Sequence, residues 1–216
     1  MEEILSSVVP DTNDTFLLER ALRTRGFSCV AGLDEVGRGP LAGPVVAACV
    51  VLPPQCDSSL YLDSKKLSHN RRCLLAGTLS EIGALMSVGI VSIATIDRIN
   101  ILQASLLAMK RAVENLASTT LPSPDFLLID GKFKIPMDTP QLTLIKGESK
   151  SASIAAASIL AKVTRDALMV DLATCFPQYN LAQNKGYPTQ EHRKAIEKYG
   201  PAPCHRKTFK GVREFV

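Results

Sequence analysis

Two adjacent carboxylates follow a short apolar segment of this chain and precede a glycine-rich turn. The acids are Asp34 and Glu35, and the turn that follows contains Gly37, Arg38 and Gly39. Successive side chains of a strand point to opposite faces, so one of two neighbouring acids faces inward, which is costly unless a cation meets it. Glycine lets the backbone approach a ligand closely, and arginine can bind phosphate oxygens through two parallel hydrogen bonds. The combination predicts metal-assisted chemistry at a phosphodiester, although the short pattern alone also fits a strand end with solvated acids.

Two further acids occur in settings that suit the same site. Asp130 ends an apolar run immediately before Gly131, and Glu148 precedes a helix expected over 153–173. Hydrolysis with two metal ions needs several carboxylates around cations about 4 Å apart, and Mg²⁺ or Mn²⁺ suits a set of oxygen ligands. Each acid also has a structural alternative. Asp130 can start a turn, and Glu148 can be stabilised by the positive end of a helix.

The elements that would position these acids mix strands with helices. Asp14 or Thr15 can cap a first helix over 12–25, and strands over 28–35 and 43–52 flank the glycine-rich turn as a hairpin. We therefore predict an α/β domain with a mixed sheet flanked by helices, and a small helical C-terminal portion. The remaining elements are expected as a helix over 68–84 capped by Ser68, a strand over 86–94, a helix over 95–117 that opens at Thr95, strands over 125–131 and 141–145, the helix over 153–173, a loop over 177–188, a helix over 189–199 and an irregular tail over 200–216.

The composition restricts the classes of partner. With 25 basic and 21 acidic residues among 216, the net charge is only +4, so any contact with nucleic acid must be local. Lys65–Lys66 and residues 204–207 are candidate clusters, whereas Arg71–Arg72 is expected on a solvated helix surface. The six cysteines form no Cys-x-x-Cys pair and the three histidines are scattered. We expect free thiols in a reducing cytosol, with surface or capping histidines rather than a zinc site.

The ends and apolar runs of the chain suggest where it works. No basic region precedes an apolar segment at the N-terminus, and no apolar run reaches the length of a membrane span. The protein is therefore expected to be cytoplasmic and to act without a membrane.

Four blocks of the sequence together carry a more specific signal. They cover residues 31–46, 128–131, 146–166 and 184–189. In this order they resemble the signature of the ribonuclease HII family, the type 2 ribonucleases H. The resemblance spans about residues 28–209 and implies a ribonuclease H-like sheet in which the first and fourth strands are adjacent.

The resemblance assigns roles to the acids. It implies that the catalytic and metal-binding residues are Asp34, Glu35, Asp130 and Glu148, with Mn²⁺ or Mg²⁺ as the cofactor. The family usually has aspartate where this chain has Glu148, and the additional methylene changes the reach of that carboxylate. Asp166 lies within the third block, and we interpret it as a structural partner of Arg165 or of another neighbour.

The resemblance also implies how substrate is recognised. Gly37, Arg38 and Gly39 would contact the ribose 2′-hydroxyl and adjacent phosphates, and Tyr187 would pack against the deoxyribose that follows a ribonucleotide. The 2′-hydroxyl is the group that distinguishes RNA from DNA at a given site. Without the resemblance, Tyr187 would be interpreted as a packing residue. Further candidate phosphate contacts are Lys65, Lys150 and the pair His205–Arg206.

These roles predict an endoribonuclease. It would hydrolyse the RNA strand of RNA–DNA hybrids and cut 5′ of ribonucleotides embedded in duplex DNA, leaving 3′-hydroxyl and 5′-phosphate ends. A DNA junction resolvase on the same fold and a non-catalytic hybrid-binding module are the alternatives. Only 33 residues precede Asp34, which is too few for the extra domain of type 3 relatives. We expect a monomer, with possible contact to a sliding clamp through the tail 207–216.

This function also divides the chain into three expected parts. They are an N-terminal helical extension (1–27), the catalytic core (28–175) and a C-terminal substrate-reading portion of the same domain (176–216).

Overall fold

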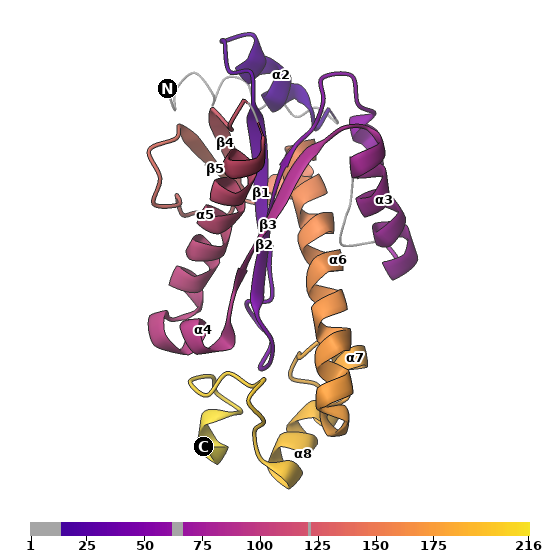
Figure 1. The fold of residues 1–216 in the computed structure, drawn as a ribbon, viewed down its shortest axis with the longest axis vertical. Helices are drawn as coiled ribbons and strands as arrows, with labels where there is room; N and C mark the ends of the chain where they lie inside the picture. The colour runs from indigo at the N-terminus through magenta and orange to yellow at the C-terminus, as the bar shows by residue number, and fades with distance from the viewer. Residues whose placement is uncertain (1–13, 62–66, 121) are drawn as a thin grey trace.

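A mixed five-stranded sheet forms the centre of the part of the chain that the structure describes (Figure 1). The structure is a computed structural model, and it describes residues 14–61, 67–120 and 122–216. The strand order is β3-β2-β1-β4-β5. The strands are β1 (Val30–Val36), β2 (Val45–Val51), β3 (Leu85–Val91), β4 (Phe126–Asp130) and β5 (Gln141–Leu144).

The register of β1 determines which side chains meet at the edge of the site. β1 and β2 form the predicted antiparallel hairpin, in which Asp34 lies opposite Ala48. β1 pairs with β4 in parallel, and Leu33 lies opposite Ile129. The adjacency of the first and fourth strands is therefore confirmed. Because parallel strands end at the same edge of the sheet, the acids that end β1 and β4 become neighbours.

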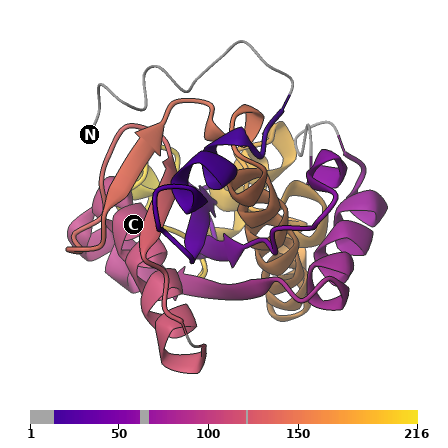
Figure 2. The same ribbon diagram turned by 90° about the horizontal axis from the view of Figure 1, so that it is seen from above.

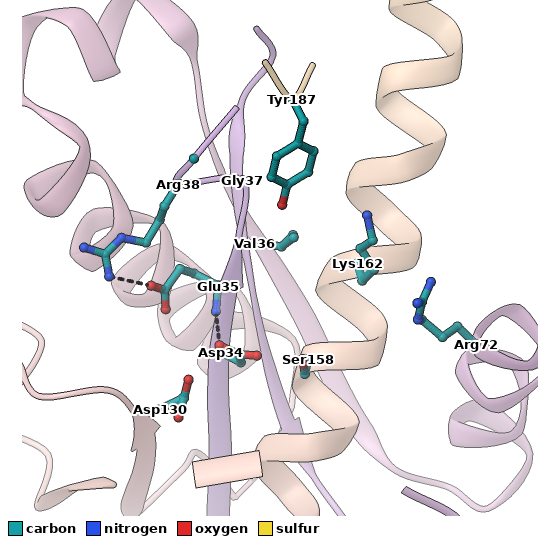
Figure 3. Close-up of a pocket in the computed structure, with 11 residues that line it drawn as sticks. Asp34, Glu35, Val36, Gly37, Arg38, Arg72, Asp130, Ser158, Lys162 and Tyr187 are labelled. Carbon is teal, nitrogen blue, oxygen red and sulfur yellow. Dashed lines mark hydrogen bonds and ion pairs between the residues drawn. The ribbon is translucent and has the colours of Figure 1, made fainter. Parts of the chain in front are cut away.

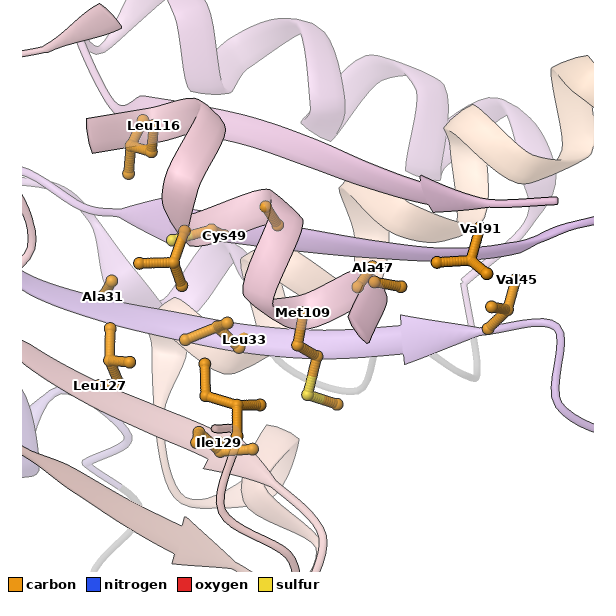
Figure 4. Packing of buried hydrophobic residues seen from close by; sticks show 14 of the residues in the cluster. Ala31, Leu33, Val45, Ala47, Cys49, Val91, Met109, Leu116, Leu127 and Ile129 are labelled. Carbon is orange, nitrogen blue, oxygen red and sulfur yellow. The ribbon is translucent and has the colours of Figure 1, made fainter. Parts of the chain in front are cut away.

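Helices cover both faces of this sheet (Figures 1 and 2). α5 (Ile101–Thr119) covers one face, where its apolar side packs on alternate residues of β1, β2 and β4. Figure 4 shows Met109 and Leu116 of this helix against Leu33 and Leu127 of the sheet. α6 (Ala152–Cys175) and α3 (His69–Glu81) cover the other face. This buried apolar surface provides the main stabilisation of the fold.

The long helix α6 lies directly on strand β1. A Cβ atom placed on Gly32 would lie 2.1 Å from the carbonyl carbon of Ser153, so only glycine permits this approach. The first turns of α6 are rich in alanine and are buried on nearly every side, as predicted from the small-residue run. This close packing places the polar face of the following turns of α6 beside the end of β1.

The predicted helix over 95–117 is in fact two helices. α4 (Ile93–Ile99) begins after Ser92, whose side chain accepts a hydrogen bond from the Thr95 N–H. The helix therefore begins before the predicted Thr95, and β3 ends at Val91, short of the predicted 94. Asn100 then adopts φ 67°, and its side chain accepts hydrogen bonds from the first N–H groups of α5. With ψ 165°, Asn100 lies far from the helical region, so α4 ends there and α5 begins in a new direction.

The other helices follow the prediction with shifted ends. α2 (Leu17–Arg23) is shorter than the predicted 12–25, of which 12 and 13 lie outside the described residues. Asp14 accepts a hydrogen bond from the Phe16 N–H but does not cap α2. Ser68 caps α3 as predicted. The expected loop over 177–188 contains a short helix, α7 (Leu181–Asn184), before α8 (Gln190–Tyr199). Short 3₁₀ helices are η1 (Ser58–Tyr61), η3 (Gly147–Ser149), η4 (Pro177–Tyr179) and η5 (Arg213–Phe215).

The C-terminal portion packs at the end of the sheet where the β1–β2 turn projects (Figure 1). Its apolar cluster joins Met169 of α6 to Leu181 and Ile196, and it includes Leu41 of the turn. All six cysteines are free thiols, as predicted. Among the residues described, no helix has the length and apolar character needed to cross a membrane.

Candidate active site

Three of the predicted acids line one cavity at the edge of the sheet (Figure 3). Asp34 and Glu35 come from the end of β1, and Asp130 comes from the end of β4. The cavity has a volume of about 370 Å³ and is also lined by the glycine-rich turn, by α6 and by Tyr187. The structure thus brings together carboxylates that are 96 residues apart in sequence, counting from Asp34 to Asp130.

Asp34 is the most deeply placed of these acids. Its side chain points towards α6, where it forms a hydrogen bond with Ser158, and it also accepts one from the Glu35 N–H at 2.7 Å. Burial raises the pKa of Asp34 well above its usual range, and the charges of Glu35 and Asp130 raise it further. A neighbouring cation would oppose both effects, because it would stabilise the charged form.

Glu35 points away from Asp34, as the alternation of a strand requires. Its carboxylate accepts a hydrogen bond at 3.1 Å from Arg38, whose side chain is about half exposed. Burial raises the pKa of Glu35, the Arg38 guanidinium opposes this shift, and Asp130 adds to it. Arg38 therefore partly compensates the negative charge on the outer side of the site.

Asp130 is fixed by the turn that carries the fourth predicted acid. The Gly147 N–H donates a 2.6 Å hydrogen bond to Oδ1 of Asp130. Glu148 follows directly in η3 and is half-buried, but it does not line the cavity. The residue next to Glu148 thus contacts Asp130. The side chain of Glu148 itself does not line the cavity.

The site suits a hard divalent cation by its chemistry. In the described part of the chain, no three acidic, histidine or cysteine side chains are already gathered closely enough to hold a metal ion. Asp34, Glu35 and Asp130 would therefore have to turn towards one another to share one. All of their donor atoms are carboxylate oxygens. Burial and neighbouring negative charge raise the pKa values of Asp34 and Glu35. This oxygen-only set with excess negative charge fits Mg²⁺ or Mn²⁺.

Two buried arginines hold the glycine-rich turn beside the acids. Arg206 is fully buried and donates to the carbonyl oxygens of Gly37, Arg38, Pro40, Gly43 and Pro44. Arg165 is also fully buried and donates to the carbonyl oxygens of Ala42, Pro44 and Lys185. Burial lowers the pKa of Arg206 to about 9, and the charge of Arg165 contributes to this shift. The turn is thereby fixed before any ligand arrives.

Tyr187 closes the cavity on the side of this turn. Its hydroxyl points into the cavity, and the side chain is 41% exposed. The ring passes Gly39, where an added Cβ would lie 3.8 Å from Cε1 of the tyrosine. The preceding Gly186 has φ +80°, and its carbonyl accepts a 2.8 Å hydrogen bond from the Leu41 N–H. The ring and the turn are therefore tied together through the backbone.

The structure corrects several expectations about basic residues. His205 and Arg206 are buried, so neither is a phosphate contact, because Arg206 uses its guanidinium to bind the turn. Lys150 follows η3 and does not line the cavity, and Lys65 lies outside the described residues. Arg72, expected on a solvated surface, lines the cavity instead.

Sequence reasoning missed a polar stripe on α6. Ser158 and Lys162 line the cavity, and Lys162 forms a 2.7 Å ion pair with Asp166, which therefore pairs with this neighbour and not with Arg165. The three residues are spaced by four positions, which places them on one face of a helix. That spacing was visible in the sequence and would have identified them.

The sheet order, the acids at adjacent strand ends and the covering helices define the ribonuclease H-like class of hydrolases. The chain matches the family model described as Ribonuclease HII over residues 31–212. It belongs to the ribonuclease HII family, whose members are hydrolases acting on RNA in RNA–DNA hybrids.

Named relatives and solved structures agree with this assignment. The chain is 57% identical over 216 residues to Ribonuclease HII of Desulfotalea psychrophila, an alignment that covers 100% of this chain and 96% of the relative. It resembles the crystal structure of ribonuclease H2 from Pyrococcus horikoshii OT3 with a TM-score of 0.68 and 25% identity, covering 87% of this chain and 97% of the other. It also resembles a chain in the PCNA:RNase HII complex from Archaeoglobus fulgidus, with a TM-score of 0.71 and 25% identity over 85% and 96% of the two chains.

The raised pKa of Asp34 predicts that this carboxylate destabilises the metal-free protein. An acid whose pKa is higher in the folded state binds protons more tightly there, so stability falls as pH rises from 3.8 through the raised value. Asp34→Asn should therefore raise Tm at pH 7.5 in buffer with a chelator, by about 2–4 °C for each kcal/mol removed. The gain should diminish towards pH 4, where the side chain is neutral in the folded state of both proteins.

Scanning calorimetry across this pH range measures the effect. Glu114→Gln, at an exposed position of α5, is the matched control and should show no such pH-dependent gain. A Tm for Asp34→Asn below that of the wild type at pH 7.5 would contradict this description of the site.

Proposed function

We propose that this protein cuts the phosphodiester bond on the 5′ side of a ribonucleotide, both in RNA–DNA hybrids and at single ribonucleotides in duplex DNA. One observation carries the proposal. The acids of β1 and β4, the turn at residues 37–39 and Tyr187 line the same cavity. The acids proposed to hydrolyse the phosphodiester and the residues proposed to recognise the sugar are thus within reach of one nucleotide.

The acids would hold the divalent cations on which ribonucleases H depend. When bound there, Mg²⁺ or Mn²⁺ would supply an activated water and stabilise the leaving oxygen, which gives 3′-hydroxyl and 5′-phosphate ends. Asp34, Glu35 and Asp130 are the principal ligands in this proposal. Glu148 would complete the set from the η3 turn, since its neighbour Gly147 already contacts Asp130.

The glycine-rich turn is suited to bind the ribonucleotide through its backbone. Arg206 engages the carbonyl oxygens of Gly37 and Arg38. In a planar trans peptide, the N–H of the next residue points opposite to that carbonyl. The N–H groups of Arg38 and Gly39 therefore point away from Arg206 and can donate to a 2′-hydroxyl or phosphate oxygen. The half-exposed Arg38 side chain adds a charge that attracts phosphate.

Tyr187 would distinguish the sugar that follows the ribonucleotide. Its ring is exposed within the cavity and passes Gly39, which has no side chain to separate it from a bound sugar. A deoxyribose can pack against the ring, whereas a 2′-hydroxyl at this position would need space and a hydrogen-bond partner. This accounts for cleavage at a junction between RNA and DNA.

The C-terminal tail is our proposed contact for a sliding clamp. Asp97 of α4 binds the tail through the Lys207 and Thr208 N–H groups, and Phe215 and Val216 beyond it are exposed. The structural relative from Archaeoglobus fulgidus is in a complex with PCNA, which supports this proposal. Since one chain supplies every group of the proposed site, we further propose that the protein acts as a monomer, with residues 176–216 reading the substrate.

Cleavage of a duplex with one ribonucleotide tests the proposed reaction. The wild type should cut it with Mg²⁺ or Mn²⁺ but not with a chelator, and Asp130→Asn should lower kcat at least about 100-fold, because metal ions supply several kcal/mol at the transition state. End labelling should show a 3′-hydroxyl and a 5′-phosphate.

The choice of control substrate separates the alternatives. An all-DNA four-way junction should not be cut, and its cleavage would indicate a resolvase. Binding of hybrid without turnover under any metal condition would indicate a non-catalytic module, and near-normal activity of Asp130→Asn would refute the metal site.

Substrate comparison tests the role of Tyr187. Tyr187→Ala should lower cleavage at a lone ribonucleotide relative to a continuous hybrid by about one to two orders of magnitude, if the ring contact is worth as much as base stacking on an aromatic residue. Tyr187→Phe should retain most of the ratio, because it keeps the ring. Tyr199→Ala, which removes an exposed tyrosine of α8, is the matched control. An equal effect of Tyr187→Ala on both substrates would make Tyr187 a packing residue.

A further inference from the structure

Two buried histidines meet directly behind Tyr187. His192 of α8 and His205 of the C-terminal segment are 0% and 1% exposed, and their Nε2 atoms lie 3.0 Å apart. The expectation of surface or capping histidines is therefore wrong for both. Nδ1 of His192 lies 2.9 Å from the backbone carbonyl oxygen of Tyr187. The histidine pair therefore contacts Tyr187, the residue that we propose recognises the sugar.

The hydrogen bonds of this pair fix where each proton lies. The Tyr187 carbonyl oxygen can only accept, so Nδ1 of His192 carries a proton and donates it. Neutral His192 then accepts at Nε2, so the proton of His205 is on its Nε2. Nδ1 of His205 consequently carries no proton and accepts from the Ala202 N–H at 3.0 Å, while the Ala202 carbonyl oxygen lies farther from it, at 3.3 Å. One directed chain therefore runs from Ala202 to Tyr187, and both rings are neutral in it.

The surroundings favour these neutral rings. The ring of Tyr179 lies edge-on to His205 with centroids 4.6 Å apart, and its hydroxyl donates to the Gly200 carbonyl. Cys204 Sγ lies 3.6 Å from Nδ1 of His205, and burial raises the pKa of this thiol to about 11. On α8, Glu191 accepts from Asn180 and Arg193 donates to the Pro188 carbonyl, and their charges act on the pKa of His192 in opposite directions. Burial lowers the pKa of His205 to about 4 and also lowers that of His192.

We propose that His192 and His205 are positioning residues that hold the Tyr187 ring in the cavity for recognition of the ribonucleotide junction. This inference rests on the proposed function of Tyr187. The adjacent Arg206 binds the carbonyl oxygens of the turn, and residue 205 forms a backbone bridge with Ala42. The dipeptide His205–Arg206 therefore keeps the two substrate readers, Tyr187 and the turn, in a fixed relation.

Protonation disrupts the chain at either ring. A second proton on His192 would occupy Nε2 and face the Nε2–H of His205, so that two donors oppose each other. A second proton on His205 would displace the hydrogen bond from the Ala202 N–H, although the Ala202 carbonyl oxygen 3.3 Å away could accept it. Because the pKa of each histidine is lower in the folded state, the packing of this region loses stability as pH falls from 6.5 towards about 4. Junction recognition should weaken over the same range.

Two matched variants of His192 test the direction of the chain. The Asn amide nitrogen reaches about the place of Nδ1, so His192→Asn keeps the donor to Tyr187, whereas the Gln amide reaches about the place of Nε2, so His192→Gln removes it. The measurement is the ratio of kcat/KM on a lone ribonucleotide to kcat/KM on a continuous hybrid. We expect His192→Gln to lower the ratio about tenfold, as a lost positioning contact would, and His192→Asn to keep it near the wild-type value.

A double variant and a pH series give measurements that would not change if the two histidines only stabilised the fold. In a Tyr187→Ala background, His192→Gln should not lower the ratio further, because both changes act through the same ring. The wild-type ratio should fall with acidification, and that of His192→Asn should fall less, because only His205 remains to be protonated. Equal ratios for the two His192 variants, or additive effects with Tyr187→Ala, would overturn the proposal.

Nuclear magnetic resonance tests the protonation states without any cleavage. In a His69→Gln background only His192 and His205 contribute imidazole signals, since the chain has three histidines. Nitrogen-15 spectra at pH 7 should show the proton on Nδ1 of one ring and on Nε2 of the other. Finding both rings in the same tautomer, or charged at pH 7, would overturn the inference. A wild-type protein that fails to cut the lone ribonucleotide but shows the expected tautomers would instead count against the proposed function alone.

Discussion

The site depends on one unfavourable interaction, the burial of the Asp34 carboxylate next to two other acids. Parallel pairing of β1 with β4 brings Asp130 beside Asp34, and α6 can cover Asp34 only because Gly32 lets the helix lie on the strand. Burial and the neighbouring charges raise the pKa of Asp34. Protein without a cation must tolerate this cost. A cation bound at that point would relieve this cost, and the rest of the cavity surrounds it.

The glycine-rich turn shows a second use of buried charge. Arg165 and Arg206 are both fully buried, yet they donate hydrogen bonds to backbone carbonyl oxygens of the turn and of Lys185. Charged donors form stronger hydrogen bonds than neutral ones, so these contacts stiffen a segment that glycine would otherwise leave flexible. Arg206 and Tyr187 both belong to the C-terminal part of the chain. The proposed substrate-reading residues and the proposed catalytic acids are thus brought together by packing and not by proximity in sequence.

The apolar patterns predicted most of the strands and helices, because alternating and helical apolar spacings persist in the final structure. The family resemblance predicted that the first and fourth strands are adjacent. The apolar patterns misplaced helix ends where single residues decide them, as at Ser92 and Asn100. Sequence reasoning also misassigned His205 and Arg206, since a polar cluster in sequence does not show whether its partners are solvent or buried carbonyl groups. Ser158 and Lys162 lay on a four-residue spacing that could have been recognised. Glu148 stays a prediction, because the cavity does not include it.

The central claim is that Asp34, Glu35 and Asp130 together bind the divalent cation. Isothermal titration calorimetry with Mn²⁺ on folded protein measures this directly and requires no substrate. We expect the wild type to bind Mn²⁺. Asp34→Asn and Asp130→Asn should each bind it at least about tenfold more weakly, because each loses a charged ligand worth more than about 1.4 kcal/mol. The surface control Glu114→Gln should bind it with unchanged affinity. Equal Mn²⁺ affinity in all four proteins would contradict the account.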